Sequence, residues 1–458
     1  MTAPTPTIGR FGYSRLKSKP SAYSFTVLSY LKADACIKFQ KEDCVKAKSR
    51  RVEVKPFSFV HIADLHLGYA QYNLEVRRED FDNAFREATD KTIELKPDFM
   101  LIAGDLFHHA RPSNVTLETV ISNFRRLRDA GIPVLVVDGG HDSAPNMVTG
   151  TILNPLDSAG LIHYLPRQEG ACWQNDSCYV YGVPNFRTKT RTAEQLPLFL
   201  EQNKPSPDPS RFNIFLFHMA LDLPYVTPPH MEAEASPEQL PDGFNYFAGG
   251  HVHKPSTNKF KDGLLVYSGC TETVSYDDAR ESKGFYHVEV NEKGVPKINR
   301  VNLESPRKFV VLEPDYTGLL PSKITQEAVE LVKEKDEEGA IIVVVLKGKL
   351  PTEANRAEVD LTQVREAAKK ALLVYPLLRL SETEVSEEVI RAIFEGGLKD
   401  LKTKAFEYFL QVFAERYSRE QAEKIARLAV NIIEPLSRKD EDSVKKEMEA
   451  FMHESGNS

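Results

Sequence analysis

The chain has 458 residues, a formal net charge of −7, 41% hydrophobic residues and 27% charged residues. This composition is typical of a soluble globular protein of two or three domains, and no apolar run approaches the ~20 residues that cross a membrane. The five cysteines form no CxxC pair. Their spacing argues against a zinc ribbon or a disulfide scaffold and favours a reducing, cytoplasmic location.

The first 55 residues are strongly basic. They contain 12 Lys and Arg against 4 Asp and Glu, a net charge of +8, so the remaining chain carries −15. We interpret residues 1–55 as a disordered extension, and the alternative is an arm that binds nucleic acid. The segment lacks a long apolar stretch followed by small residues, so a secretory signal is not expected.

Alternating strands and helices are predicted from Phe57 onward. Apolar runs of strand length alternate with segments that carry apolar residues at helical spacing. The strands are predicted at residues 57–64, 98–105 and 132–139, and the helices at residues 77–95 and 116–131. This order implies an α/β core with a largely parallel sheet.

The chain becomes rich in strands after this first unit. Five further apolar runs lie at residues 178–184, 212–219, 244–250, 264–269 and 284–290. We expect them to form a second sheet that packs on the first. The predicted fold of residues 56–304 is therefore an α/β sandwich of two sheets flanked by helices.

A small α+β module is predicted from residue 305 to residue 385. Strand patterns at residues 307–316 and 339–348 flank a helical pattern at residues 324–337, and a second helix is predicted at residues 362–373. A segment of this length is long enough to form a small capping domain.

Residues 386–458 are predicted to be helical and highly charged. Helical patterns lie at residues 387–401, 403–417 and 419–436. An apolar stripe is formed by Phe406, Phe409, Leu410 and Phe413. The usual interpretation of such a stripe is packing among its own helices, and docking into the groove of a partner is the alternative.

The residues that indicate chemistry follow the predicted strands. Each histidine or aspartate alone is more often a packed residue or a helix cap than a ligand. Together they favour a metal site, because ligands collect at the carboxyl ends of strands in α/β sheets. Mixed Asp and His ligands suit Mn, Fe or Zn, and a bridging carboxylate suits a metal pair for phosphoryl chemistry. The residues are Asp64, His66, Asp105, His108, His141, Asp142, His218, His251 and His253.

The order of these groups resembles a known family. Asp-x-His, Gly-Asp, Gly-x-His-Asp, a lone His and Gly-His-x-His form the signature of the calcineurin-like metallophosphoesterases. The stretches "HIADLHLGY", "LIAGDLFHHARPS" and "GHVHKP" are similar to those of archaeal DNA double-strand-break repair nucleases of the Mre/SbcD family. The resemblance covers Phe57 to about Glu304 and extends more weakly through the capping module and the helical tail.

The resemblance implies two divalent metal ions, most readily Mn²⁺. One ion would be bound by Asp64, His66 and His253, and the other by His218 and His251, with Asp105 bridging both. Water between the ions would attack the DNA phosphorus in line.

The resemblance also implies roles for the groups beside the ions. His141 would be the general acid that protonates the leaving oxygen, since the pKa of a histidine lies near the working pH. His108 would orient the phosphate or His141. Asp142 would fix the tautomer of a site histidine.

Gly140 departs from the family pattern. The family has Gly-Asn-His followed by Asp or Glu, where the Asn carbonyl binds the second ion, and this chain has Gly139-Gly140-His141-Asp142. Water, a backbone carbonyl or a neighbouring side chain could take that place. We expect a weaker second metal site with retained activity; a looser site with full activity and a loss of catalysis are the alternatives.

The resemblance implies a metal-dependent nuclease that removes nucleotides from duplex ends and cuts single strands. It also implies a nucleoid-associated protein, a homodimer, and an ABC-type coiled-coil ATPase bound by residues 386–458. Two rivals remain: a phosphodiesterase for small substrates, and a non-catalytic scaffold for DNA ends and the ATPase.

DNA binding has little support in the charges themselves. The chain after residue 55 is acidic, whereas DNA-binding proteins neutralise phosphates with Lys and Arg. Some helical arginines could assist, although such residues are usually only solvated. These are Arg77, Arg78, Arg111, Arg125 and Arg126.

Overall fold

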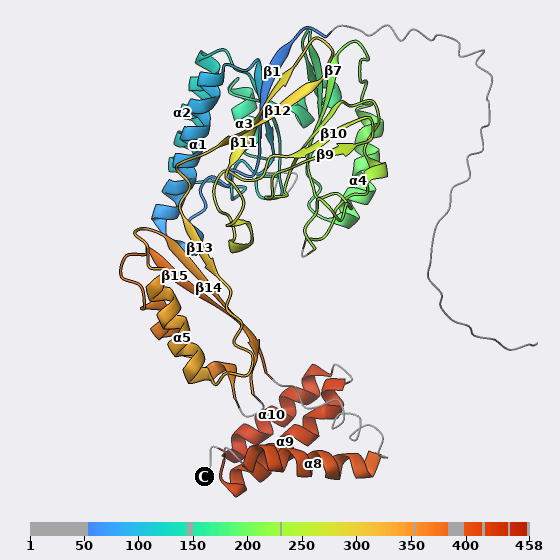
Figure 1. The fold of residues 1–458 in the computed structure, drawn as a ribbon. Helices are drawn as coiled ribbons and strands as arrows, with labels where there is room; N and C mark the ends of the chain where they lie inside the picture. Colours follow the sequence, from blue (N-terminus) through green and yellow to red (C-terminus); the bar gives the residue numbers. More distant parts are fainter. Residues whose placement is uncertain are drawn as a thin grey trace, which may run out of the picture. The chain divides into compact units, whose positions relative to one another are not determined.

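The computed structural model shows the fold in Figure 1. The described residues are 54–143, 150–229, 231–351, 354–382, 398–414, 417–437 and 440–455. The chain divides into two units, residues 1–50 and residues 51–458. The prediction for the basic extension and most of the prediction for helix 387–401 lie outside the described residues.

The first sheet has the strand order β12-β11-β1-β2-β3-β4. Strands β1 to β3 are parallel, as predicted, and β4 continues them. The strand at residues 284–290, expected in the second sheet, is wrong in its placement: as β11 it pairs antiparallel with β1 and, with β12, extends the first sheet. Parallel pairing places the carboxyl ends of β1, β2 and β3 at one edge. The strands are β1 (Phe57–Ile62), β2 (Phe99–Ala103), β3 (Val134–Val137), β4 (His163–Tyr164), β11 (Gly284–Val290) and β12 (Pro296–Asn302).

The second sheet has the order β5-β6-β7-β8-β10-β9. Its strands β6, β7, β8 and β10 are parallel, and its two edge strands pair antiparallel. The carboxyl ends of β7 and β8 therefore also meet at one edge. The strands are β5 (Cys172–Gln174), β6 (Cys178–Gly182), β7 (Phe212–His218), β8 (Tyr246–Gly250), β9 (Ser256–Phe260) and β10 (Gly263–Tyr267).

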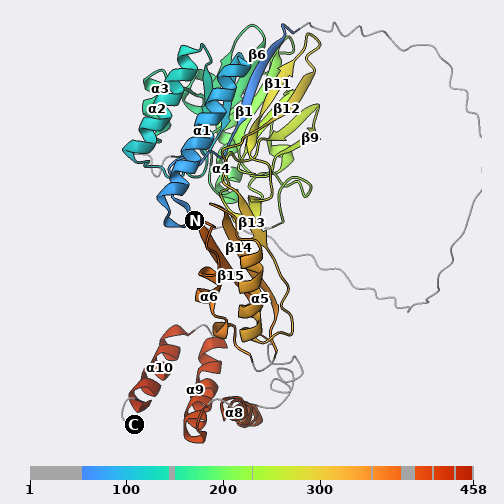
Figure 2. The ribbon, with the colours of Figure 1, turned by 60° about the vertical axis from the view of Figure 1, so that its left-hand side comes forward.

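Helices cover the outer faces of both sheets, as Figures 1 and 2 show. They are α1 (Glu75–Leu95), α2 (Asn114–Asp129) and α3 (Leu153–Ser158) on the first sheet and α4 (Lys189–Gln202) on the second. Helix α2 begins where the Ser113 hydroxyl accepts from the Thr116 amide and ends before Gly131, whose φ is 75°. The predicted stop at Gly131 is confirmed, because a left-handed residue ends a helix.

The apolar residues form three layers. Successive residues of a strand face opposite sides, so Val60 and Ile62 pack under α1 and α2 while Phe57 and Phe59 face the second sheet. The Phe59 ring lies 5.3 Å from that of Phe99 between the two sheets. The predicted class, an α/β sandwich of two sheets flanked by helices, is confirmed.

Residues 309–381 form a third sheet of parallel strands. It contains β13 (Phe309–Leu312), β14 (Ile341–Lys349) and β15 (Leu373–Ser381), with α5 (Pro321–Glu334) and α6 (Leu361–Arg365).

The predicted helix 362–373 is wrong, because α6 ends at Arg365 and the chain then turns into β15. The Asp336 carboxylate accepts from the amides of Lys369, Lys370 and Ala371, which fixes this turn. β15 then pairs with β14 along its whole length.

Arg77 is buried, contrary to the expectation that it faces solvent. Its guanidinium donates to Asp80 (2.6 Å) and Glu272 (3.2 Å) and lies over the Phe309 ring. Arg307 also pairs with Asp80. This network therefore joins α1 to the start of the third sheet, and Arg77 is not a DNA contact.

The C-terminal helices are α8 (Leu398–Ala414), α9 (Arg419–Ser437) and α10 (Glu441–Ser455). α9 packs on both others. In the apolar stripe, the Phe409 and Phe413 rings stack on each other and Arg427 of α9 lies over Phe406. The stripe therefore packs at least partly within its own helices. No helix among the described residues is long and apolar enough to span a bilayer.

Candidate metal centre

The predicted site residues lie on loops that leave the carboxyl ends of β1, β2, β3, β7 and β8. Asp64 and His66 follow β1, Asp105 follows β2, and His251 and His253 follow β8. His218 is the last residue of β7, and His108 and His141 lie on the loops after β2 and β3. The contacts below show that the structure brings most of these residues together, whereas His251 lies in none of the groups of described donors whose ligand atoms are within 4.8 Å of one another.

Several of these residues have unusual backbone geometry. Asp64, His66, Asp105 and His251 have positive φ angles of 53°, 46°, 49° and 84°. Such angles are uncommon for residues with a Cβ and cost free energy unless neighbouring contacts hold them. The amides of Leu65 and His66 both donate to the Asp105 carbonyl, each at 3.0 Å. The loops therefore fix each other in the conformation that presents the side chains.

Two glycines let these loops come close. A Cβ at Gly139 would lie 2.1 Å from Asp105 Oδ1, and one at Gly250 would lie 1.9 Å from the Ala103 carbonyl oxygen. Any other residue would push the loops apart. The glycines of the Gly-x-His-Asp and Gly-His-x-His motifs are thus required by packing.

Asp64, His66 and His253 form one group of donors. Their ligand atoms lie within 4.8 Å of one another, and His66 Nε2 is 3.4 Å from His253 Nε2. His253 Nδ1 lies 3.0 Å from the Asp278 carboxylate, which leaves Nε2 as the nitrogen facing the group. The spacing is that of donors around one ion.

Asp105 lies between this group and a second one. Its Oδ2 is 3.7 Å from His66 Nε2 and 3.3 Å from His218 Nε2, while Oδ1 accepts from the His141 amide. Asp64, Asp105 and His218 are all buried and also lie within ligand spacing. One carboxylate oxygen therefore faces histidines on both sides.

His218 presents a buried nitrogen toward the carboxylates. Its Nδ1 donates to the Ala103 carbonyl at 2.8 Å, and its Nε2 is buried without a hydrogen-bond partner among the described residues. Burial alone would lower the pKa of His218, but the Asp105 and Asp64 carboxylates outweigh it and raise the pKa to about 10. The position therefore favours a positive charge beside these carboxylates.

Burial also affects Asp64. It raises the pKa of Asp64 to about 6, because an ionised carboxylate is costly away from water. A nearby cation would remove this cost.

Comparison with known proteins identifies the family. The family model for calcineurin-like phosphoesterase matches residues 57–255. DNA double-strand break repair protein Mre11 of Methanocaldococcus jannaschii is 31% identical over 265 residues, 55% of this chain and 68% of the relative. Mre11 of Archaeoglobus fulgidus is 30% identical over 356 residues, 72% of this chain and 77% of the relative. The chain belongs to the Mre11 family of calcineurin-like phosphoesterases.

More distant relatives extend the match. Mre11 of Thermoplasma acidophilum is 24% identical over 402 residues, 86% of this chain and 97% of the relative. Among solved structures, a dimetal phosphatase from Danio rerio covers 55% of this chain at 12% identity, but its TM-score of 0.33 is too low to carry an argument.

Membership of the metallophosphoesterases implies divalent metal ions, and the donors fit. The unpartnered Nε2 of His218 and the Asp105 oxygen between two histidines are the features that a metal pair requires. The donors are oxygen and imidazole nitrogen, which suit Mn, Fe or Zn.

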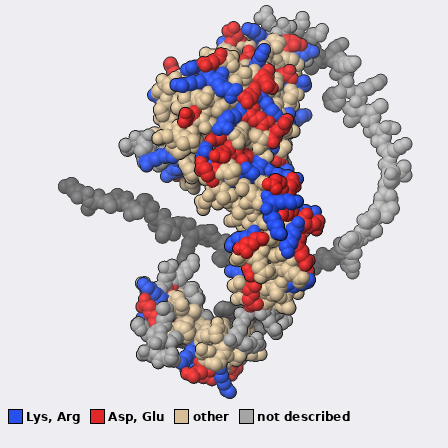
Figure 3. All heavy atoms as spheres, turned by 90° about the vertical axis from the view of Figure 1, so that its left-hand side faces the viewer, with Lys and Arg blue, Asp and Glu red and all other residues tan. Residues whose placement is uncertain are grey.

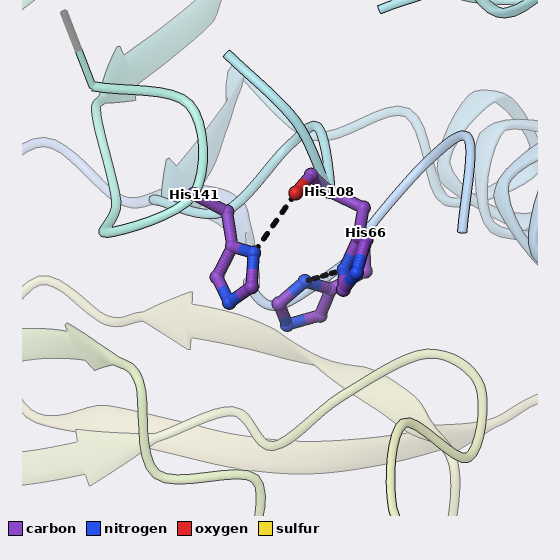
Figure 4. A group of neighbouring side chains, drawn as sticks. All are labelled: His66, His108 and His141. Atoms are coloured by element: carbon purple, nitrogen blue, oxygen red, sulfur yellow. Dashed lines mark hydrogen bonds between the residues drawn. The ribbon is translucent and has the colours of Figure 1, made fainter. Parts of the chain in front are cut away.

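His108 and His141 lie beside His66, as Figure 4 shows. The exposed His141 directs Nδ1 at the His108 carbonyl oxygen at 2.9 Å, so Nε2 is the nitrogen available to a ligand. His108 Nδ1 lies 3.2 Å from His66 Nδ1, and its ring stacks on Tyr69. Burial, then the nearby His141, lowers the pKa of His108 to about 3, which keeps His108 neutral.

Asp142 does not contact a site histidine, contrary to our expectation. Its Oδ1 accepts from the Gly139 amide at 2.7 Å, and its Oδ2 accepts from the amides of Leu106 and Phe107. The side chain therefore holds the loops after β2 and β3 together, and it reaches backbone because both loops turn their amides inward.

Asp278 and Glu234 were not anticipated from the sequence. Asp278 accepts from His253 Nδ1 and pairs with the buried Lys283 ammonium at 2.7 Å. Glu234 Oε2 lies 3.6 Å from His251 Nε2. Both acids lie in connections between strands, where no motif or periodicity singles them out.

A third group of possible ligands consists of His253, Cys270 and Asp278, and a lysine side chain already supplies a positive charge there. The Lys283 Nζ lies 2.7 Å from Asp278 Oδ1 and 3.4 Å from Cys270 Sγ. An ammonium in this place supplies the positive charge, so this group is structural.

Proposed function

We propose that this protein is a metal-dependent nuclease that hydrolyses phosphodiester bonds of DNA in double-strand-break repair. The observation that carries the proposal is the position of Asp105 Oδ2, 3.7 Å from His66 Nε2 and 3.3 Å from His218 Nε2. This position would suit a carboxylate shared by two ions. The choice of DNA as the substrate rests on the relatives, which are named DNA double-strand break repair protein Mre11.

The chain offers donors for two divalent ions. When bound, such ions make water a stronger nucleophile and offset the charge that develops on the phosphoryl oxygens. The donors of the first ion would be Asp64, His66, Asp105 and His253, and those of the second Asp105, His218 and His251.

The polar neighbours of these donors hold each one in place. The Asp278 carboxylate keeps the proton of His253 on Nδ1, and the Ala103 carbonyl does the same for His218. In both rings a bound metal would then take Nε2 in place of a proton. The His251 amide donates to Asp64, which fixes that carboxylate between the two sheets.

His141 is the proposed proton donor to the leaving oxygen. With Nδ1 held by the His108 carbonyl, Nε2 can meet a bound phosphodiester at the exposed side of the centre. His108 orients His141 through this contact and through ring stacking, with centroids 4.6 Å apart and planes inclined by 27°.

The finer features of the function remain part of the proposal. They are a preference for Mn²⁺, exonuclease action on duplex ends, endonuclease action on single strands, a homodimer and a nucleoid-associated, cytoplasmic location. We also propose that residues 386–458 bind an ABC-type coiled-coil ATPase, and that residues 56–304 and 305–385 are the nuclease and capping domains.

Cleavage of end-labelled duplex DNA against a chromogenic aryl phosphodiester, at equal Mn²⁺, tests the proposal. We expect DNA to be cut and His141→Ala to lose cleavage while still binding two ions. His109→Ala, a change at an exposed neighbouring histidine, serves as the matched control. Turnover of the small diester without DNA cleavage would support the small-substrate enzyme, and no cleavage at any Mn²⁺ concentration would support the scaffold.

A further inference from the structure

The second ion of the proposed centre has an incomplete set of donors. Gly140 stands where a ligand is expected, and it has no side chain. A Cβ built at Gly140 meets nothing within 4 Å, so no described side chain fills the space beside it. A further donor must therefore come from elsewhere in the chain or from solvent.

Glu234 lies at ligand distance from His251. Its Oε2 is 3.6 Å from His251 Nε2, which is too long for a hydrogen bond. Two donors that each lie about 2.1 Å from one ion are about 3.0 Å apart at a right angle and about 4.2 Å apart on opposite sides. The pairs His66–His253 (3.4 Å) and Asp105–His218 (3.3 Å) fall in the same window.

Glu234 is held in this position by the segment that follows β7. Its Oε2 accepts from the Ala220 amide at 3.1 Å, and its own amide donates to the Ala220 carbonyl at 2.8 Å. Ala220 lies two residues after His218, so the two side chains are tied to one piece of backbone.

Among the described residues, the cationic neighbour of Glu234 is His218 and not a lysine or arginine. The Glu234 side chain is 11% exposed, and no lysine or arginine of the described chain forms an ion pair with it. His218 Nε2, fully buried, has no hydrogen-bond partner among the described residues. Glu234 and His218 therefore both lie beside His251, whose ring centroid is 5.2 Å from that of His218, and His218 Nε2 itself lies 3.3 Å from Asp105 Oδ2.

We propose that Glu234 is a ligand of the second ion and supplies the oxygen donor that Gly140 cannot. The inference rests on the proposed metal centre and deepens it. The residues that would hold the second ion are then Asp105, His218, His251 and Glu234. A carboxylate at this place carries a full negative charge, unlike an amide, and so favours a hard divalent cation such as Mn²⁺.

Calorimetric titration with Mn²⁺ and the magnetic coupling of the bound ions in electron paramagnetic resonance test the inference without DNA. Glu234→Gln keeps the shape and an oxygen for the Ala220 amide but removes the charge. We expect it to weaken the second site at least about 10-fold while the first site is unchanged. Glu232→Gln, an exposed glutamate on the same connection, should leave both sites intact.

Gly140→Asn in the Glu234→Gln background should restore the second site, because the space at Gly140 admits a side chain. Melting temperatures in EDTA show whether each variant folds, and Glu234→Asp, which retracts the carboxylate, provides a second test if the glutamine variant does not. Wild-type affinity for two ions in Glu234→Gln, or a wild-type protein that binds one ion, would overturn the inference. Two coupled ions without DNA cleavage in the wild type would instead refute the proposed function and leave Glu234 as a ligand.

Discussion

Replacement of Asp278 by asparagine should destabilise the fold and weaken the first metal site together. The Asp278 carboxylate pairs with the Lys283 ammonium at 2.7 Å, and the two side chains are only 6% and 7% exposed. Removal of one member of a buried ion pair costs about 3–5 kcal/mol, because the other charge stays buried without its partner. Asparagine keeps one oxygen for Lys283, so we expect the free energy of unfolding to fall by about 3 kcal/mol.

The same substitution acts on the metal through His253. Asp278 lies 3.0 Å from His253 Nδ1 and fixes the proton there. Asparagine would turn either a weaker acceptor or a donor toward this nitrogen, so the ring would lose its orientation. Loss of such a partner typically reduces metal affinity about 10–100-fold.

Urea unfolding in EDTA measures the stability, and calorimetric Mn²⁺ titration measures the affinity. Lys283→Met in the Asp278→Asn background removes the unpaired ammonium, so stability should partly return while Mn²⁺ affinity stays low. A change in stability below about 0.5 kcal/mol would refute the ion-pair argument. Unchanged Mn²⁺ affinity would refute the role of Asp278 in holding His253.

Three other changes test separate parts of the structure. Phe59→Ala, between the sheets, should lower the free energy of unfolding by about 3–5 kcal/mol in urea titrations, whereas Leu198→Ala, half exposed on α4, should change it little. Burial would raise the pKa of Glu87, but hydrogen bonds from Ser305, Lys91 and the Glu304 amide lower it to about 2. The stabilisation from Glu87 is therefore present above its unfolded pKa and lost as the pH falls toward 2, so Glu87→Gln should destabilise the protein at pH 7 more than at pH 2 in unfolding titrations. Deletion of residues 386–458 should spare Mn²⁺-dependent cleavage and abolish co-elution with the ATPase; co-elution of the truncated chain would contradict the tail assignment.

The donors at the strand ends could be predicted because their position follows from simple rules. Apolar runs mark parallel strands, and parallel strands bring their carboxyl ends to one edge, where Asp64, Asp105 and His218 now lie. The two sheets and their flanking helices follow from the same runs. The turn before β15 could not be predicted, because the Asp336 carboxylate that fixes it is distant in sequence.

The supporting acids could not be predicted for a related reason. Asp278 reaches His253 across 25 positions, and Glu234 reaches the histidine after β8 from a connection without strand or helix periodicity. The burial of Arg77, in contrast, could have been predicted from the sequence. Arg77 lies four residues before Phe81, so helical spacing indicated the buried face of α1, and the structure adds Asp80 and Glu272 as its partners.

The charge of the centre would link metal binding to the proposed DNA binding. The chain after residue 55 carries −15. On the face that includes α1 and α2, Lys and Arg are interspersed with Asp and Glu and form no continuous basic stripe (Figure 3). Without cations, the ionised Asp64 and Asp105 would repel a phosphate at the centre. Two divalent ions in the proposed centre would carry twice the charge of these two carboxylates and would still exceed it when Glu234 is added, so they would make the centre attractive to a phosphodiester before any bond is broken.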